Sequence, residues 1–440
     1  MDNWRQKLDG LRARVAEVAA ECDLKYAGSQ ERRPAPSPLT GSIGTDVLSG
    51  EEVETAFGRH FEMEKLYAGH RQHGSADIGA LSDLPHDLLG TLSGGTIPAV
   101  RPQEWAFLDI ETTGLAGGSG VCAFLVGVGR ITGEGFRVRQ FLMRDYGEEA
   151  SLLDALARHL EPFRVMITYN GRAFDQPLLE ARYRWNRARA PFARMEHLDL
   201  LHGARRLWKL RFESCRLVDL ENQVLGVERE GDIPGALIPY VYFEYQRTGQ
   251  ALRILPVLEH NSIDILTLAC LTGIVPAAFQ DPNSSETLRH GGEMTGLARW
   301  LRAAGDLEGA RTLLRRAVGL KADNQSRVSL RDELLFHVLW DLAQLERKLE
   351  ARDRALEIWM DLACGSNPFQ VRAIEELAKH YEHRAKDRQK ALEWTRAARA
   401  LDDSPELIRR EARLSKSLLA ASKPLRKAPK NARRRSLTAH

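Results

Sequence analysis

Three apolar, strand-like runs follow one another between residues 104 and 143, and they constrain the fold of this chain more than any other feature. The runs are EWAFLDI, VCAFLVGVGRI and FRVRQFLM. The glycine-rich turns between them are too short for a helical crossover, so neighbouring strands must run antiparallel. We therefore expect an antiparallel meander at the start of the folded domain.

The segment after the meander alternates helices with strands. EEASLLDALARHLEPF places its leucines on one helical face, and RVMITYN then has the pattern of a strand. FDQPLLEARYRWNRA follows as a helix and MEHLDLL as a further short strand. Three antiparallel strands followed by alternating helices and strands predict an α/β fold, a mixed sheet flanked by helices.

No strand pattern continues beyond residue 285. Residues 285–408 hold three helix–turn–helix units, with Ala310, Ala355 and Ala391 at comparable positions, 45 and 36 residues apart. Such spacings are typical of tetratricopeptide-like helical hairpins with irregular turns. We expect an all-α helical-hairpin repeat domain that binds a protein partner or extends a nucleic-acid track.

The two ends of the chain have other patterns. Residues 1–26 have the apolar spacing of one amphipathic helix, and residues 27–102 are predicted to be a linker and irregular segment. Residues 409–440 carry eleven Lys or Arg residues and one acid, a net charge of +10. We expect this basic tail to be disordered. Because the whole chain has a net charge of +3, nucleic-acid binding must depend on local basic patches.

Four histidines are scattered among glycines between residues 44 and 100. A metal site built from His60, His70 and His73 is one interpretation. No acid or thiol stands at a ligand spacing beside them, so we favour surface histidines, with His86 as the fourth.

The composition excludes several classes of protein. A length of 440 residues with 43% hydrophobic and 28% charged residues is typical of a soluble protein of two or three domains. The N-terminus lacks the apolar core of a signal peptide, and the longest apolar stretch contains Asp264 and Pro276. We therefore expect a cytoplasmic protein without a membrane partner. The five cysteines lie far apart, which argues against a disulfide framework or a thiolate zinc site.

Acidic residues stand at the ends of three predicted elements. Asp109 and Glu111 alternate with an isoleucine at the end of the first strand, so both carboxylates point to one side of the sheet. Asp175 begins the helix after RVMITYN, and His260 and Asp264 share one face of a later helix. Each has a structural alternative, such as a strand-end acid, a partner of the helix dipole or a packed histidine. A single metal site would explain all of them together.

Carboxylates that meet in one place repel each other. A pair 4 Å apart costs about 4 kcal/mol at an effective dielectric near 20, and only cations or protons relieve it. Oxygen ligands on rigid elements suit Mg²⁺ or Mn²⁺, and two such ions can hold a phosphodiester for hydrolysis. The small residues between Gly114 and Gly120 would let a phosphate backbone approach the ions, although a tight turn explains them nearly as well.

Three motifs in this order resemble those of a known superfamily. DIETTG, NGRAFDQPLL and HNSID resemble the exonuclease motifs of the DEDD superfamily, and the second is most similar to that of B-family DNA polymerase proofreading exonucleases. HLDLLHGARRLW and IPGALIP make the chain more similar still to the YprB-like ribonuclease H-like proteins of bacteria, some of which carry C-terminal tetratricopeptide repeats.

The resemblance covers roughly residues 103–280 and implies a ribonuclease H-like exonuclease domain there. It implies that Asp109, Glu111, Asp175 and Asp264 bind two Mg²⁺ or Mn²⁺ ions. It also implies a metal-dependent hydrolase that trims single-stranded nucleic acid from the 3′ end. DNA and RNA are not distinguished.

The third motif departs from the polymerase pattern, which has tyrosine four residues before its aspartate. His260 stands at that spacing, and we expect it to orient or deprotonate the attacking water. Asn170 is expected to support the turn before Asp175. Asp199 is expected to be a supporting acid rather than a primary ligand.

A basic segment follows Asp199. Phosphate contacts and base stacking are expected from the residues of ARRLWKLRF, namely Arg205, Arg206, Trp208, Lys209 and Arg211. The alternative is a solvated basic segment whose aromatic side chains pack inward. The alternative function is a non-catalytic scaffold that binds nucleic acid while its helical repeats recruit protein partners.

Overall fold

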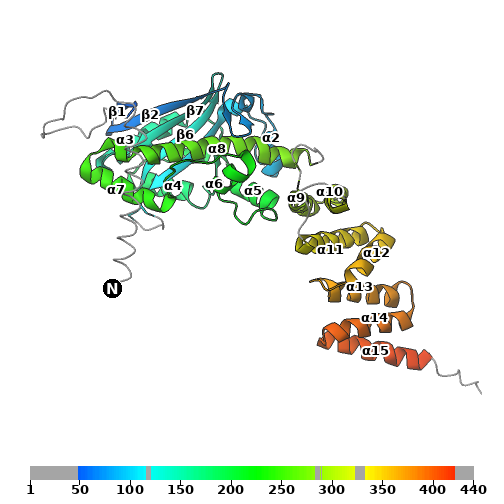
Figure 1. Cartoon of the computed structure of the whole chain (residues 1–440). Helices are drawn as coiled ribbons and strands as arrows, with labels where there is room; N and C mark the ends of the chain where they lie inside the picture. Colours follow the sequence, from blue (N-terminus) through cyan, green and yellow to red (C-terminus); the bar gives the residue numbers. More distant parts are fainter. Residues whose placement is uncertain (1–47, 115–119, 283–287, 289, 323–331, 422–440) are drawn as a thin grey trace, which may run out of the picture. The chain divides into compact units, whose positions relative to one another are not determined.

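The structure is a computed structural model that describes residues 48–114, 120–282, 288, 290–322 and 332–421 (Figure 1). The chain forms two compact units, Met1–Arg289 and His290–His440. The predicted N-terminal helix over residues 1–26 lies outside the described residues, as does the chain beyond residue 421.

The first unit is built around a seven-stranded mixed sheet with the strand order β1-β2-β7-β6-β5-β8-β9. Neighbours from β1 to β5 are antiparallel, whereas β8 and β9 run parallel to β5. This arrangement confirms the predicted meander and mixed sheet. The strands are β1 (Gly50–Thr55), β2 (Gly58–Ala68), β5 (Trp105–Thr112), β6 (Ala123–Thr132), β7 (Gly135–Leu142), β8 (Val165–Thr168) and β9 (Glu196–Asp199), and a separate hairpin pairs β3 (Gln72–His73) with β4 (Ala76–Asp77).

The segment that was predicted to be an irregular linker contributes two strands of this sheet. Over residues 50–68 the prediction is wrong, because β1 and β2 extend the sheet beyond β7. The buried positions of β2 include His60 and Glu62, which bond to each other instead of presenting apolar side chains. A polar pair facing inward hides the apolar–polar alternation that identifies a strand.

Both interpretations of the histidines are wrong for His60. Its ring is fully buried and bonds to Ser151 Oγ and Glu62 Oε1, both at 2.9 Å. The His73 side chain is 11% exposed and contacts Thr267 and Glu221, whereas His70 and His86 are exposed. The described residues hold no metal-ligand cluster around them.

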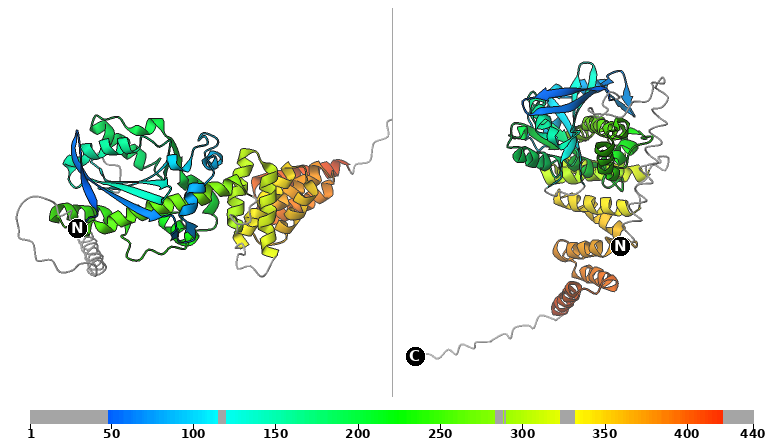
Figure 2. Two further views of the ribbon diagram at one scale, coloured as in Figure 1. Left: turned by 90° about the horizontal axis from the view of Figure 1, so that it is seen from above. Right: turned by 90° about the vertical axis from the view of Figure 1, so that its left-hand side faces the viewer.

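Helices cover both faces of the sheet (Figures 1 and 2). The long helix α8 contacts β5, β6 and β7 on one face, and an apolar cluster on the other face draws side chains from α3, α4 and α7. The helices of this unit are α2 (Leu88–Leu92), α3 (Glu149–His159), α4 (Asp175–Trp185), α5 (Leu200–Trp208), α6 (Leu217–Leu220), α7 (Ile238–Thr248) and α8 (Leu255–Gln280). Short 3₁₀ and π turns lie between them at η1 (Gly79–Asp83), η2 (Pro102–Glu104), η3 (Tyr146–Glu148), η4 (Pro191–Arg194), η5 (Glu221–Leu225), η6 (Gly235–Leu237) and η7 (Ala251–Arg253).

Helix α8 is apolar because it is a core helix. Together with η7 it is long and apolar enough to cross a membrane by length and composition, but 72% of its most apolar window is buried inside the protein. It packs closely on β6, where a Cβ added to Gly127 would lie 2.3 Å from Asn261 Oδ1 and from Ile265 Cδ1. Glycine therefore lets α8 lie directly against the strand beside β5.

The second unit consists of consecutive helical hairpins in which each helix packs on the next. Ala310, Ala355 and Ala391 are fully buried, as small residues at helix contacts should be. The helices are α9 (Gly291–Ala304), α10 (Leu307–Ala322), α11 (Asp332–Lys348), α12 (Arg352–Ala363), α13 (Gln370–His383), α14 (Arg388–Leu401) and α15 (Pro405–Ala421). The assignment to tetratricopeptide repeats stays a prediction.

The predicted disordered tail begins too early. Residues 409–421 belong to α15, which packs on α14 through ion pairs of Glu411 with Arg396 and Arg399. Leu407 and Leu414 are buried, so an apolar stripe runs through the basic sequence.

Candidate functional site

The first two acids lie at the end of β5 and face α8. Asp109 pairs in register with Gly127 of β6. A Cβ added at Gly127 would point at Asn261 of α8, so this face of the two strands is turned toward α8. Leu108 and Ile110 point the other way, into the apolar cluster. Asp109 and Glu111 are partly exposed as whole residues, and burial still dominates the surroundings of their carboxyl groups.

Asn261 positions Asp109 and was not predicted. Its Nδ2 donates to Asp109 Oδ2 at 2.8 Å, and its own Oδ1 accepts from Gln140 Nε2 at 2.9 Å. Gln140 also donates to the carbonyl of Leu258, which fixes the amide orientation. Asn261 is fully buried, and a polar residue at a buried helix position next to an acid was the signal that could have identified it.

Asp175 is the first residue of α4 and is held by a tight turn after β8. Asn170 in that turn has a φ of 69°, a left-handed conformation that asparagine tolerates. Its backbone N–H donates to Asp199 Oδ1 at 2.8 Å, and Arg172 N donates to Asp199 Oδ2. A Cβ on Gly171 would lie 2.7 Å from Asp175 Oδ2, so the backbone passes close to the carboxylate.

Asp199 is buried and also caps α5 by accepting from Leu201 N. Its carboxylate is occupied by backbone donors from two segments. These contacts place Asp199 beneath the Asn170 turn, where it ties the end of β9 to the loop before Asp175. The unpredicted His197 supports the same region, bonding to Thr168 Oγ1 at 2.8 Å and Gln176 Oε1 at 2.6 Å.

The acids of β5, α4 and α8 act on one another electrostatically. Burial and the charges of Asp264, Glu111 and Asp175 together raise the pKa of Asp109 well above its usual range. Burial raises the pKa of Glu111 to about 8, and Asp264 and Asp175 add to this while His260 opposes it. Burial likewise raises the pKa of Asp175 to about 7. Asp109 and Glu111 therefore lie within electrostatic reach of Asp264 and Asp175, and these four acids are called the acidic cluster below.

His260 lies between two acids on the α8 side. Its Nδ1 bonds to Asp232 Oδ1 at 2.8 Å, and its Nε2 lies 3.6 Å from Asp264 Oδ2. Burial alone would lower the pKa of the ring, but the Asp232 hydrogen bond and the charges of Asp264 and Glu111 outweigh burial and raise it to about 9. A protonated ring has no free lone pair, so His260 could act as a base only after losing its proton. This role of His260 stays a prediction.

Arg229 is the residue at the site that sequence reasoning missed most completely. Its guanidinium donates to Asp264 Oδ1 and Glu221 Oε2 at 2.5 Å and to Asp232 Oδ2 at 3.3 Å. The side chain is only 4% exposed. Arg229 and Asp232 lie in the glycine-flanked segment before α7, where a dense run of charges was the available signal.

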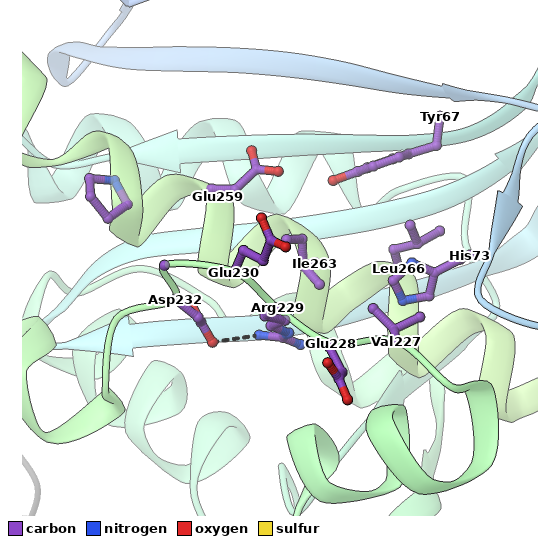
Figure 3. A pocket seen from close by; sticks show the side chains of 12 residues that line it. Tyr67, His73, Val227, Glu228, Arg229, Glu230, Asp232, Glu259, Ile263 and Leu266 are labelled. Atoms are coloured by element: carbon purple, nitrogen blue, oxygen red, sulfur yellow. Dashed lines mark hydrogen bonds and ion pairs between the residues drawn. The ribbon is translucent and has the colours of Figure 1, made fainter. Parts of the chain in front are cut away.

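A pocket of ≈ 430 Å³ opens beside this arginine (Figure 3). The segment 227–232 forms one wall, and residues of α8 and the β2–β3 region form the other. Figure 3 shows Arg229 and Asp232 facing each other, with Tyr67 and His73 on the opposite side. The pocket therefore borders the segment that carries Arg229 and Asp232, while Arg229 itself is 4% exposed.

The donor set suits a hard divalent cation. Asp109, Glu111, Asp175 and Asp264 offer carboxylate oxygens only, and three of them have a raised pKa that a cation would lower. Even so, within the described residues no three His, Cys, Asp or Glu side chains are preformed as a metal site. The contacts of Arg229 and His260 with Asp264 give a physical reason, because these protein cations already engage one carboxylate.

The basic segment of α5 is only partly as predicted. Arg205, Arg206, Lys209 and Arg211 are exposed, but Trp208 is buried and cannot stack on a base. The prediction for Trp208 is wrong because the tryptophan continues the apolar face of α5, which is formed by Leu200, Leu201, Ala204, Leu207 and Trp208.

Two of these basic residues line a pocket of ≈ 680 Å³ next to the Asn170 turn. Arg205 and Lys209 form one side of it, and Tyr169 and Asn170 form another. Arg216 also lines it and is paired with Asp219. The glycine-rich segment expected to pass a phosphate backbone falls largely outside the described residues, since the structure describes only Gly114 and Gly120 of its glycines.

Comparison with known proteins identifies the relatives of the first unit. Residues 106–275 match the family described as the RNase_H superfamily. Over 307 residues, the chain is 32% identical to "Uncharacterized protein YprB" of Bacillus subtilis (strain 168), an alignment that covers 69% of this chain and 71% of the relative. All four predicted acids lie inside the matched segment.

Proposed function

The chain belongs to the ribonuclease H-like family that includes YprB, and from this membership and the acidic cluster we propose that it is a divalent-metal-dependent nuclease. The superfamily consists mostly of hydrolytic nucleases, and divalent ions are their common cofactors. We further propose a DEDD-type exonuclease that uses two Mg²⁺ or Mn²⁺ ions to trim single-stranded DNA or RNA from the 3′ end. These finer features come from the motif resemblance.

One observation carries the proposal. Carboxylates from β5, α4 and α8, distant in sequence, raise the pKa of Asp109 where the end of β5 meets solvent. A structural role would pair such acids with bases, whereas a role in ion binding requires them to stay in excess. Partial exposure of Asp109 and Glu111 leaves room for a phosphate group to approach.

Each residue has a defined part in this proposal. Asp109, Glu111, Asp175 and Asp264 would hold the ions, and Asn261 would keep Asp109 in one rotamer through its hydrogen bond. Bound ions supply a lowered pKa for the attacking water and neutralise charge on the phosphate. His260, oriented by Asp232, would stand beside the water and move its proton once ions shift the charge balance of the site.

The substrate surface would be the basic side of α5. Arg205 and Lys209 line the pocket next to Asn170. Asn170 precedes Asp175, the acid at the start of α4, by five residues. Exposed cations beside a strand-to-helix turn can contact successive backbone phosphates. We also propose a cytoplasmic location and a protein or nucleic-acid partner for the helical unit.

The test is hydrolysis of 5′-labelled single-stranded DNA and RNA oligonucleotides by the full chain with Mn²⁺, Mg²⁺ or chelator. We expect a ladder that shortens from the 3′ end and requires the ion. Asp109→Asn should reduce the rate by about 10³-fold or more, because it removes a ligand oxygen charge at the centre of the cluster. Glu62→Gln is the matched control, since Glu62 belongs to the same sheet but bonds to His60 and Arg139. Equal rates for wild type and Asp109→Asn would contradict the proposal.

A second candidate function is a nucleic-acid-binding scaffold without hydrolysis. The ion pair of Arg229 with Asp264 favours it, because a protein cation occupies an oxygen that the first candidate assigns to an ion. Under this alternative the oligonucleotides bind in the presence of chelator and stay intact with either ion.

A further inference from the structure

Arg229 is held by three acids from three parts of the fold. Glu221 belongs to η5, Asp232 lies on the segment before α7, and Asp264 lies on α8. Each nitrogen of the guanidinium faces a different carboxylate: Nε faces Glu221, Nη1 faces Asp232 and Nη2 faces Asp264. The planar fork is therefore fixed in orientation, with one edge directed at the acidic cluster.

The contact with Asp264 leaves this acid only partly available. Asp264 Oδ1 accepts from Arg229 at 2.5 Å, and Oδ2 has His260 Nε2 at 3.6 Å. The main influences on the pKa of Asp109 and Asp175 include no basic side chain, whereas the charge of His260 lowers the pKa of Glu111. The positive charge of the protein is thus concentrated at one corner of the cluster.

We infer that Arg229 is a built-in counter-cation of the acidic site, which holds Asp264 and competes with divalent ions for it. The inference rests on the proposed function and deepens it, because it concerns ion binding at that same site. Arg229 is a positioning residue: it is 4% exposed and too buried to contact substrate. Because Arg229 competes for Asp264, the site should bind divalent ions more weakly than the carboxylates alone would.

The charges around Arg229 explain why its removal should strengthen the binding of a divalent ion. A guanidinium stays protonated in proteins, so its repulsion of an incoming cation is permanent. Burial opposes the charge, yet the charges of Asp264, Glu221 and Asp232 raise the pKa of Arg229 further. In the low-dielectric surroundings of the cluster, removing one positive charge a few ångströms away strengthens the binding of a divalent cation severalfold or more.

A purely structural role for Arg229 predicts something different. The residue would then only anchor the segment from Gly226 to Gly235 against α8. Its removal would loosen this segment and lower stability without changing ion affinity. Ion affinity, measured apart from activity, therefore separates the two roles.

The test is calorimetric titration of the metal-free full chain with Mn²⁺ at pH 7.5. We expect Arg229→Gln to bind Mn²⁺ at least about tenfold more tightly than wild type, because a competing cation is gone. Arg229→Lys keeps the charge and should stay close to wild type. Adding Asp109→Asn to Arg229→Gln should abolish the gain, which assigns the bound ion to the acidic cluster.

Two further variants protect the test from a folding defect. Arg229→Gln leaves Glu221, which is 1% exposed, with His73 Nε2 at 3.0 Å but without its guanidinium, so the double variant Glu221→Gln/Arg229→Gln removes that charge as well and should show the same gain. Arg144→Gln is the matched control, because Arg144 is also a buried arginine paired with glutamates, on another side of the sheet. Its affinity for Mn²⁺ should equal that of wild type.

The inference is overturned if the single and double Arg229 variants bind Mn²⁺ no more tightly than wild type. This outcome is independent of the proposed function. Hydrolysis by wild type with unchanged affinity in the variants would refute the counter-cation role and leave the nuclease intact. Tighter Mn²⁺ binding by the variants without hydrolysis by wild type would support the counter-cation role and refute the nuclease.

Discussion

Two histidines of the same sheet domain, the buried His60 and the 14%-exposed His260, lie in opposite electrostatic surroundings. His60 on β2 bonds to Ser151 and Glu62, and Glu62 in turn faces Arg139 Nε at 2.7 Å. Burial opposes ionisation of Glu62, but the His60 hydrogen bond and the Arg139 charge lower its pKa. At the other site, His260 and Arg229 face an excess of carboxylates, and the pKa of Glu111 is raised to about 8.

The difference distinguishes a network that stabilises the fold from one poised to bind something. Around His60 every charge has a partner, and the contacts with Ser151 fasten β2 to α3. Around His260 the acids outnumber the bases, so the folded protein pays for keeping them together. Carboxyl groups whose pKa is raised by burial and by neighbouring acids indicate a functional site better than a histidine–acid pair does.

The comparison is sharpest when one glutamate is neutralised at each site. Glu111→Gln should raise the free energy of unfolding of the metal-free protein by about 1–3 kcal/mol at pH 7.5, because a glutamine is neutral without the proton that a carboxyl of pKa about 8 must take up on folding. Glu62→Gln should lower it by about 1 kcal/mol, because it removes the charge that bonds to the buried His60 and to the one-third-exposed Arg139. Denaturant unfolding in chelator measures both. Effects of the same sign in the two variants would contradict the distinction.

The packing of α8 can be broken without touching a charge. Gly127→Ala places a Cβ 2.3 Å from Asn261 Oδ1, so either α8 or the Asn261 side chain must move. We expect a loss of about 1–3 kcal/mol in unfolding free energy, the usual cost of overpacking. Gly133→Ala, which meets no atom within 4 Å, is the control and should change little. Thermal unfolding that does not distinguish the two variants would show that α8 does not depend on this contact.

The smallest effect concerns acid sensitivity near the His60 network. His159 packs between Phe141 and Phe163, and burial together with the charges of Arg139 and Arg130 lowers its pKa to about 4. The unfolded chain therefore binds this proton first, and stability is lost as pH falls from about 6.5 to 4. Compared with His159→Phe, wild type should lose about 1–2 kcal/mol more between pH 7 and pH 5. Urea unfolding at each pH measures these losses. Equal losses in wild type and His159→Phe would exclude His159 as the cause.

The sequence predicted the elements whose side chains follow an apolar period. Strands β5 to β9 and helices α3, α4 and α8 are confirmed, and most of them bury an apolar face, whereas α8 is apolar nearly all round and is buried along most of its length. The pattern fails where polar side chains turn inward, as at His60 and Glu62, since their partners lie far away in the chain. Trp208 is the converse case: its chemistry suggested base stacking, while its helical period, overlooked, placed it inside.

The candidate site divides in the same way. Asp109, Glu111 and Asp175 stand at element ends, so strand and helix geometry alone indicates where they point. Arg229 and Asp232 lie in a segment with no period, and only the folded chain brings them to Asp264. The run of charges in this segment marks it in the sequence, but only the tertiary structure shows which acids Arg229 contacts.

The most direct test of the account is an anomalous-scattering map from crystals of the full chain soaked in Mn²⁺. The acids of β5, α4 and α8 are predicted to give a peak at bonding distance, roughly 2.1 Å, from oxygens of Asp109 and at least one of its acidic neighbours. No peak there, or a peak bound only by other residues, would contradict the claim that these carboxylates form one cation site.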